Sequence, residues 1–257
     1  MKIVVAFKWA ANPQEATVAA DGTVDFARAT LGISEYDPQA FEVGRRLADA
    51  TGAELIGLSV GGPAATSSMA RKAALARGLD RLVTVTDPSL DGATATRTGA
   101  VLAAAVAQIG DVDLVLTGDA SVDLGAQLVP SVMAGLLGWP AVSQVEALSG
   151  TSGDLRIERN QDDGTQVLLA SGPVVVSIAA DAVEPRIPGM RDILGAGKKQ
   201  TTQLAYASLT VVPLVMSAVV GRARPELKAR QGTVIDGADP AAAAAELVAA
   251  LRATHVL

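Results

Sequence analysis

The stretch IVVAF at residues 3–7 is a continuous apolar run rich in β-branched side chains. Three further runs of the same type follow it, at residues 55–60, 82–85 and 114–117. A strand that is apolar at every position has both faces covered, which is typical of a parallel sheet with helices on both sides. The four runs therefore predict an α/β fold with the first strand inside the sheet.

The segments between these runs carry signals for helix starts and ends. A first helix is expected to open at an N-cap Asp37, followed by Pro38, and to end near residue 50 before Gly52. Three more are expected, each ending at a glycine: from Ser67 or Ser68 to Gly78, from Asp91 to Gly110, and from about Gly125 to Gly138. Strands and helices thus alternate, which predicts a doubly wound, mostly parallel sheet.

Two short regions depart from this alternation. Asp21-Gly22 lies between short alternating runs, and Asp162-Asp163-Gly164 separates residues 155–161 from 165–169. Both patterns are typical of β-hairpins. The second hairpin, with the apolar run at residues 174–178 after it, is expected to add antiparallel strands to the sheet edge.

The chain changes character after residue 178. Residues 179–200 contain two prolines and three glycines with charges of both signs and no clear period, and an irregular stretch of this length is usually functional or disordered. The tail mixes Arg222, Arg224 and Pro225 with an Ala-rich helix opened by Asp239-Pro240. We expect one α/β domain over residues 1–200, and a C-terminal extension over residues 201–257 that forms an arm packing elsewhere.

Composition excludes several classes of chemistry. The chain has no cysteine, and its single histidine, His255, lies next to the C-terminus, so thiol nucleophiles, thiolate metal sites and a Ser-His-Asp relay are all excluded. No catalytic residue and no metal site are expected. A net charge of −6 argues against nucleic acid and anionic membranes as partners. We expect no membrane insertion, no signal peptide and a cytoplasmic location.

A ligand site is expected where the chain order of the sheet reverses. If the first strand lies between the second and the fourth, the loops at residues 8–13 and 118–127 face each other. The second loop consists of small and polar residues and is expected to lead straight into a helix, whose start favours a phosphate. A nucleotide is the natural ligand.

The alternative is purely structural: Gly118 and Gly125 allow a tight turn, and Asp123 caps the helix. Neither a Walker motif nor a Gly-x-Gly-x-x-Gly fingerprint follows a strand. Lys8, Glu42 and Arg45 are expected to be solvated rather than catalytic.

Four stretches of the sequence resemble the β subunit of electron-transfer flavoproteins over essentially the whole chain. They are residues 3–8, residues 34–42, residues 59–63 with 71–81, and residues 118–127 with 136–140. Glu184-Pro185-Arg186, followed by Ile193 and Lys198-Lys199, is similar to a shortened form of that family's recognition loop. The resemblance implies an adenine-nucleotide-binding α/β fold. It also implies a heterodimer with an α subunit, FAD shared with that subunit, and electron relay from flavin dehydrogenases, such as acyl-CoA dehydrogenases, to a membrane quinone oxidoreductase.

The resemblance also implies which residues bind AMP and which meet partners. The AMP contacts carried over by position are Ala6, Ser34, Tyr36, Asp37, Val60, Gly118, Ala120, Ser121, Asp123, Gly125, Ala126 and Gln127. The dehydrogenase-docking residues are Glu184, Pro185, Arg186 and Met190, which stands where the family usually has a leucine.

The sequence departs from the family in three places. Residues 179–183 differ from the family pattern before Glu184, the lysine run is reduced to two residues, and Asp123 stands alone where an acidic cluster is usual.

Three other functions occur with such a fold, and the sequence argues against the third. A bifurcating relative would hold a second FAD in place of AMP, and a stand-alone adenine-nucleotide-binding regulator would need neither the loop at 179–200 nor the arm. An ATP-pyrophosphatase ligase would need a Ser-Gly-Gly loop after the first strand, which here reads Lys8-Trp9-Ala10-Ala11-Asn12.

Overall fold

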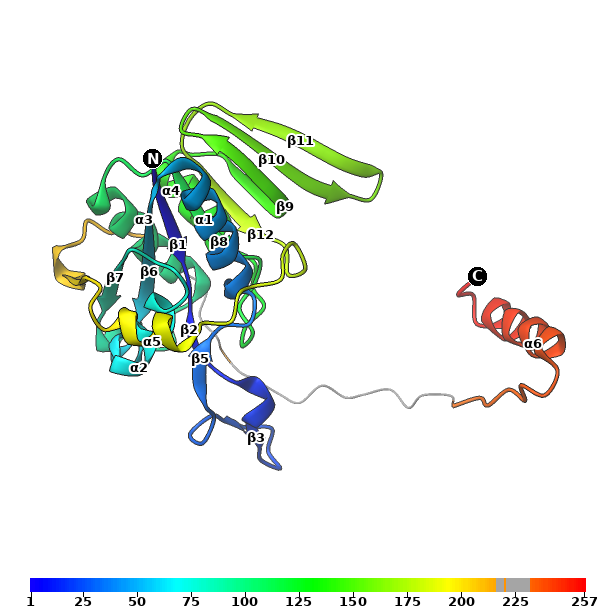
Figure 1. The fold of residues 1–257 in the computed structure, drawn as a ribbon. Helices are drawn as coiled ribbons and strands as arrows, with labels where there is room; N and C mark the ends of the chain where they lie inside the picture. The colour runs from blue at the N-terminus through cyan, green and yellow to red at the C-terminus, as the bar shows by residue number, and fades with distance from the viewer. Residues whose placement is uncertain (216–219, 221–231) are drawn as a thin grey trace. The chain divides into compact units, whose positions relative to one another are not determined.

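The computed structural model describes residues 1–215, 220 and 232–257 (Figure 1). Its main sheet has nine strands in the order β11-β10-β9-β12-β8-β1-β6-β7-β13. Their bounds are β1 Lys2–Ala6, β6 Glu54–Gly61, β7 Arg81–Thr86, β8 Leu114–Gly118, β9 Ala141–Thr151, β10 Asp154–Gln161, β11 Gly164–Ala170, β12 Val174–Ile178 and β13 Thr201–Ala205. The α/β class and the mostly parallel sheet are therefore confirmed.

The centre of the sheet has the predicted arrangement. Strand β1 pairs in parallel with β6 on one side and with β8 on the other, so the chain order reverses between β1 and β8. Only β10 runs antiparallel to its neighbours, β9 and β11, which confirms the added antiparallel hairpin. The expectation that the run at residues 174–178 belongs with these antiparallel edge strands is wrong, because it forms β12, which lies inside the sheet and pairs in parallel with β8 and β9. Strand β13 was not expected. It pairs in parallel with β7 at the opposite edge, and the main sheet therefore takes in residues beyond 200.

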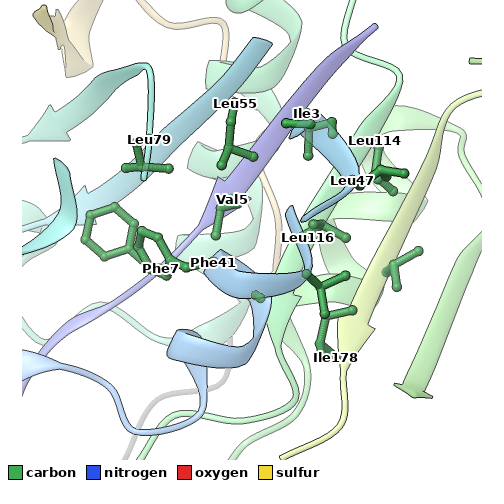
Figure 2. Packing of buried hydrophobic residues seen from close by; sticks show 14 of the residues in the cluster. Ile3, Val5, Phe7, Phe41, Leu47, Leu55, Leu79, Leu114, Leu116 and Ile178 are labelled. Carbon is green, nitrogen blue, oxygen red and sulfur yellow. The ribbon is translucent and has the colours of Figure 1, made fainter. Parts of the chain in front are cut away.

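Two apolar cores cover the two faces of the sheet. Ile3, Val5 and Phe7 pack toward α1 (Asp37–Thr51) and α2 (Ser68–Leu75). Phe41 and Leu47 of α1 lie in the same cluster (Figure 2). Alternate side chains point the other way, toward α3 (Ala95–Ile109) and α4 (Val129–Leu137). Burying one such large side chain stabilises the fold by about 1.5–3 kcal/mol. The continuous apolar runs are explained because each strand supplies both cores.

The helix ends agree with the sequence in some places and differ in others. Ser67 caps α2 by accepting a hydrogen bond from the Ala70 amide at 3.1 Å, and Gly52 ends α1 with φ of 69°. The expected start of α3 at Asp91 is wrong, because Asp91 follows a short 3₁₀ turn at Pro88–Leu90 and the Thr94 hydroxyl caps the helix instead. The expected role of Asp37 as an N-cap is also wrong, since it lies inside the first turn of α1.

The smaller hairpin and the stretch after β12 complete this part of the chain. Strands β3 (Thr17–Val18) and β4 (Val24–Asp25) flank Asp21-Gly22 as predicted, while β2 (Trp9–Ala11) pairs with β5 (Leu31–Ile33). Short 3₁₀ turns lie at Pro13–Glu15, Pro63–Thr66 and Tyr206–Ser208. Residues 179–200 are not irregular throughout, because they contain α5 (Met190–Ala196), whose seven residues are too few to show a helical period in the sequence.

The chain divides into two compact units, residues 1–221 and 222–257. The second contains α6 (Pro240–Ala253), which Asp239 caps as predicted by accepting hydrogen bonds from the Ala241 and Ala242 amides. Arg222, Arg224 and Pro225 of the expected arm lie outside the described residues. Within the described ranges, every helix is too short or too polar to cross a bilayer.

Candidate functional site

Three segments meet where β1 and β8 end. Lys8 follows β1, Asp37 begins α1, and Gly118 is the last residue of β8. The Lys8 amide donates a hydrogen bond to Asp37 Oδ2 at 2.8 Å. A Cβ added to Gly118 would lie 2.5 Å from the Tyr36 carbonyl oxygen and 2.7 Å from Asp37 Oδ1, so only glycine allows this approach. The two loops predicted to face each other are therefore held together by one carboxyl group.

The environment of Asp37 changes its protonation. The residue is 4% exposed. Burial raises the pKa of Asp37 to about 7, although hydrogen bonds from the Lys8 and Gly118 amides and the charge of Lys8 act in the opposite direction. The negative charge of Asp123 adds to the increase. This carboxyl group consequently changes charge near neutral pH, where an ordinary aspartate would be fully ionised.

The loop at residues 118–127 is tied to the same junction. Lys8 Nζ donates to both carboxylate oxygens of Asp123, at 2.8 and 2.7 Å. The buried hydroxyl of Ser34 accepts a hydrogen bond from the Val122 amide at 3.1 Å. Asp123 therefore pairs with Lys8, and the alternative in which it caps a helix is wrong. Lys8 is correspondingly not a freely solvated side chain, as the sequence had led us to expect.

The loop does not lead straight into a helix. The Gly125 amide donates to the Ser121 carbonyl at 2.8 Å, and Gln127 Nε2 donates to Asp119 Oδ2 at 2.9 Å, which folds the loop back on itself. Helix α4 begins only at Val129, and Pro130 removes one amide donor from its first turn. The expected helix start near residue 125 is wrong, so a phosphate here would depend on the loop and on Lys8 rather than on a helix end.

The residues predicted to bind a nucleotide lie at or near the carboxyl ends of the central parallel strands. Asp37, Ser34 and Gly118 are joined to the loop by the contacts described above. Ala6 lies in register with Thr117 of β8, and Val60 lies at the end of β6, the other neighbour of β1. The remaining predicted residues lie in or beside the loop, namely Tyr36, Ala120, Ser121, Asp123, Gly125, Ala126 and Gln127.

Sequence reasoning missed Thr117. It follows Val115 by two residues and so shares that residue's face of the sheet, toward α3 and α4, with Ala6 as its neighbour in β1. Its hydroxyl is buried and has no hydrogen-bond partner among the described residues. A buried polar atom without a partner is costly and points to a missing ligand or water. The sequence signal that could have identified it is its position, because Thr117 is the one polar residue at the end of the apolar run at residues 114–117.

Acidic side chains line a cavity of about 300 Å³ beside the loop. Asp119, Glu146 and Asp181 contribute carboxylates, and Gln144 and Asn160 contribute amides. In the described part of the chain no group of such side chains is arranged to hold a metal ion.

The four predicted docking residues lie in a different region, in and before α5. Met190 is 74% exposed, and its apolar neighbours Ile187 and Leu194 are 92% and 69% exposed. Glu184 is exposed and Pro185 is half-buried, whereas the Arg186 side chain turns back to the carboxylate of Glu42. The expectation that Glu42 is solvated is wrong, since its side chain is only 5% exposed.

The chain was compared with models of known protein families. The chain fits the model of the electron transfer flavoprotein domain over residues 21–209.

Proposed function

The chain belongs to the electron transfer flavoprotein family, and from that premise we propose that it is the β subunit of a heterodimeric electron transfer flavoprotein. In this role it is an electron-carrier subunit rather than an enzyme. It would bind AMP where β1 and β8 end, complete the binding site of an FAD shared with the α subunit, and dock flavin dehydrogenases. Electrons would then pass toward a membrane quinone oxidoreductase.

The observation that carries the AMP proposal is the junction of Lys8, Asp37 and Gly118. It brings a cation and a loop of small residues to the point where parallel strands diverge, which is where open α/β sheets bind nucleotides. The residues present fit the ligand: small side chains let a phosphate approach the loop amides, and the Thr117 hydroxyl lacks a partner among the described residues. We infer that Lys8 binds the phosphate while Asp123 keeps the ammonium group in place.

The docking proposal depends on exposed side chains in and just before α5. Ile187, Met190 and Leu194 are apolar and exposed, and a flexible thioether can fit anchor pockets of several shapes. We propose that these side chains meet flavin dehydrogenases. When bound, the flavin itself carries the electrons, and this chain supplies binding and position.

The C-terminal arm is proposed to contact the α subunit. Helix α6 has no buried residue, and even its apolar side chains Leu247 and Val248 are 49% and 38% exposed. An isolated helix of this length is marginal in water, so it gains stability from packing against another surface. Deleting residues 222–257 is expected to abolish binding of the α subunit.

The decisive experiment is co-expression with an α subunit, followed by denaturation and identification of the released nucleotides. We expect one FAD and one AMP per heterodimer, and little flavin on the isolated chain. Two FAD per heterodimer would select the bifurcating alternative. A chain that binds an adenine nucleotide but no α subunit would be the stand-alone regulator, and strong flavin binding by the isolated chain would also contradict the proposal.

A further inference from the structure

A buried carboxylate on α1 holds the docking segment, which we define as residues 184–196. Glu42 accepts hydrogen bonds from Arg186 Nε at 2.6 Å and Arg186 Nη2 at 3.2 Å, and one from Arg46 Nε at 2.7 Å. Arg186 lies 144 positions farther along the chain than Glu42, whereas Arg46 is one helical turn away. The tertiary contact of Glu42 is therefore made with the docking segment.

The charge of Glu42 depends on these partners. Burial by itself raises the pKa of this carboxyl group, but the hydrogen bonds from Arg186 and Arg46 outweigh that effect and lower the pKa to about 2. Glu42 is thus ionised at neutral pH. If Arg186 moved away, the buried carboxylate would keep only Arg46, whose own side chain is 59% exposed. Losing one partner of a buried charge is strongly unfavourable, so the segment is held firmly at this point.

Other contacts fix the chain on both sides of this pair. Gln39 Nε2, also on α1, donates to the Ala180 carbonyl at 2.7 Å. After α5, Lys199 Nζ donates to the carbonyls of Leu75 and Leu79, at 3.1 and 2.6 Å. Ala196 of α5 is buried in the core beneath. The backbone is therefore anchored before and after the apolar side chains of the segment, although those side chains are largely exposed.

We propose that Glu42 is a positioning residue for partner docking: it touches no dehydrogenase, but its ion pair with Arg186 orders the docking segment before the partner arrives. The inference rests on the proposed function of that segment. Ordering a loop in advance removes part of the entropy cost of association, so it strengthens docking without changing the chemistry. Arg186 then acts inward, on Glu42, rather than as a contact for the partner.

The test uses the holo heterodimer with Glu42→Gln, assayed as electron acceptor from a reduced acyl-CoA dehydrogenase. We expect the apparent KM for the heterodimer to rise about tenfold while kcat, flavin content and flavin midpoint potential stay unchanged. Amide hydrogen exchange in residues 184–196 should become faster. Arg186→Gln should reproduce both changes, and the double variant should be no worse than either single variant.

The matched control is Glu54→Gln, because Glu54 makes a similar ion pair with Arg81 at 2.6 Å on β6 and β7 without touching the segment. It should alter neither the KM nor the exchange. Faster exchange in Glu42→Gln at an unchanged KM would overturn the proposal, as would an unchanged exchange rate. If the wild-type heterodimer accepts no electrons from flavin dehydrogenases, the proposed function itself fails, and the docking role of Glu42 fails with it.

Discussion

Two regions of the molecule orient their polar side chains in opposite ways. One is the junction at the carboxyl ends of β1 and β8, and the other is the docking segment. At the junction, the Lys8 side chain pairs with the Asp123 carboxylate, and the Asp37 carboxyl group accepts a hydrogen bond from the Lys8 backbone amide. In the docking segment, Arg186 turns inward to Glu42, and the apolar side chains are left outside. The first region is organised around hydrogen-bonding groups, which suit the small polar ligand that we propose for it. The second exposes apolar side chains, which suit the protein partner that we propose for it.

The largest effect is expected from the buried carboxyl group of the first region. The native pKa of Asp37 is about 7 against an ordinary 3.8, so the folded chain keeps a proton that the unfolded chain releases between these values. Stability contributed by this group is therefore present at low pH and is lost as pH rises, by about 1.4 kcal/mol per pH unit in that window. Urea unfolding of wild type and Asp37→Asn between pH 4 and pH 8 should show this slope in wild type alone. Parallel curves for the two proteins would mean that Asp37 titrates normally.

The close approach at Gly118 should give the next largest effect. Gly118→Ala places a methyl group 2.5 Å from the Tyr36 carbonyl oxygen, so the backbone must shift, and we expect a loss of about 3 kcal/mol in unfolding free energy. Gly125→Ala is the control, since Gly125 has φ of 58° but open space around it, and should lose only about 1 kcal/mol. Denaturant titration measures both. Equal losses would show that Tyr36 moves aside at little cost, so that the close approach does not require glycine at position 118.

The second region should respond in docking rather than in stability. Met190→Ala removes a side chain that is 74% exposed, so the unfolding free energy should change by less than about 0.5 kcal/mol. Docking should weaken by about tenfold, measured as the KM for the heterodimer in dehydrogenase assays. Leu169→Ala on β11 is a comparable control, since Leu169 is 76% exposed and lies outside the segment. A similar rise in KM for both variants would place the docking surface elsewhere.

The smallest effect concerns two threonines whose hydroxyls have no partner among the described residues. Thr117 faces α3 and α4, and Thr84 lies on the opposite face of the sheet. Replacing either with valine removes a buried polar atom and should stabilise the nucleotide-free chain by about 1 kcal/mol. Only Thr117→Val should also reduce the amount of AMP that co-purifies. Loss of AMP in both variants, or in neither, would remove Thr117 from the site.

Much of the fold could be predicted because its signals are local. The continuous apolar runs at residues 3–7 and 114–117 identified β1 and β8. The expected reversal of strand order between these two strands placed them side by side, as they are in the sheet. Strand β13 was not predicted because its sequence, TTQLA, is polar and shows little alternation of apolar and polar residues, as suits a strand at the sheet edge. The start of α4 was misplaced since a small-residue loop and a helix start look alike in sequence.

The candidate site could be located from the sequence, but its internal contacts could not. The small polar loop after β8 indicated which edge of the sheet to examine. Nothing nearby in sequence shows that Asp123 reaches Lys8, 115 positions away, or that Asp37 is buried beneath both loops. Thr117 was likewise overlooked because a hydroxyl without a partner is a property of its surroundings.

The sequence by itself determined the alternation of strands and helices and the resemblance to a flavoprotein subunit. It also pointed to the ends of β1 and β8, where we propose that a ligand binds. Apolar periodicity and turn residues act over a few positions, so they can be recognised without knowing what lies opposite. Only the tertiary structure decided which charges meet: Lys8 with Asp123, and Glu42 with Arg186. The physical reason is that burial and pairing between distant residues set whether a charged group is solvated, neutralised or held in place.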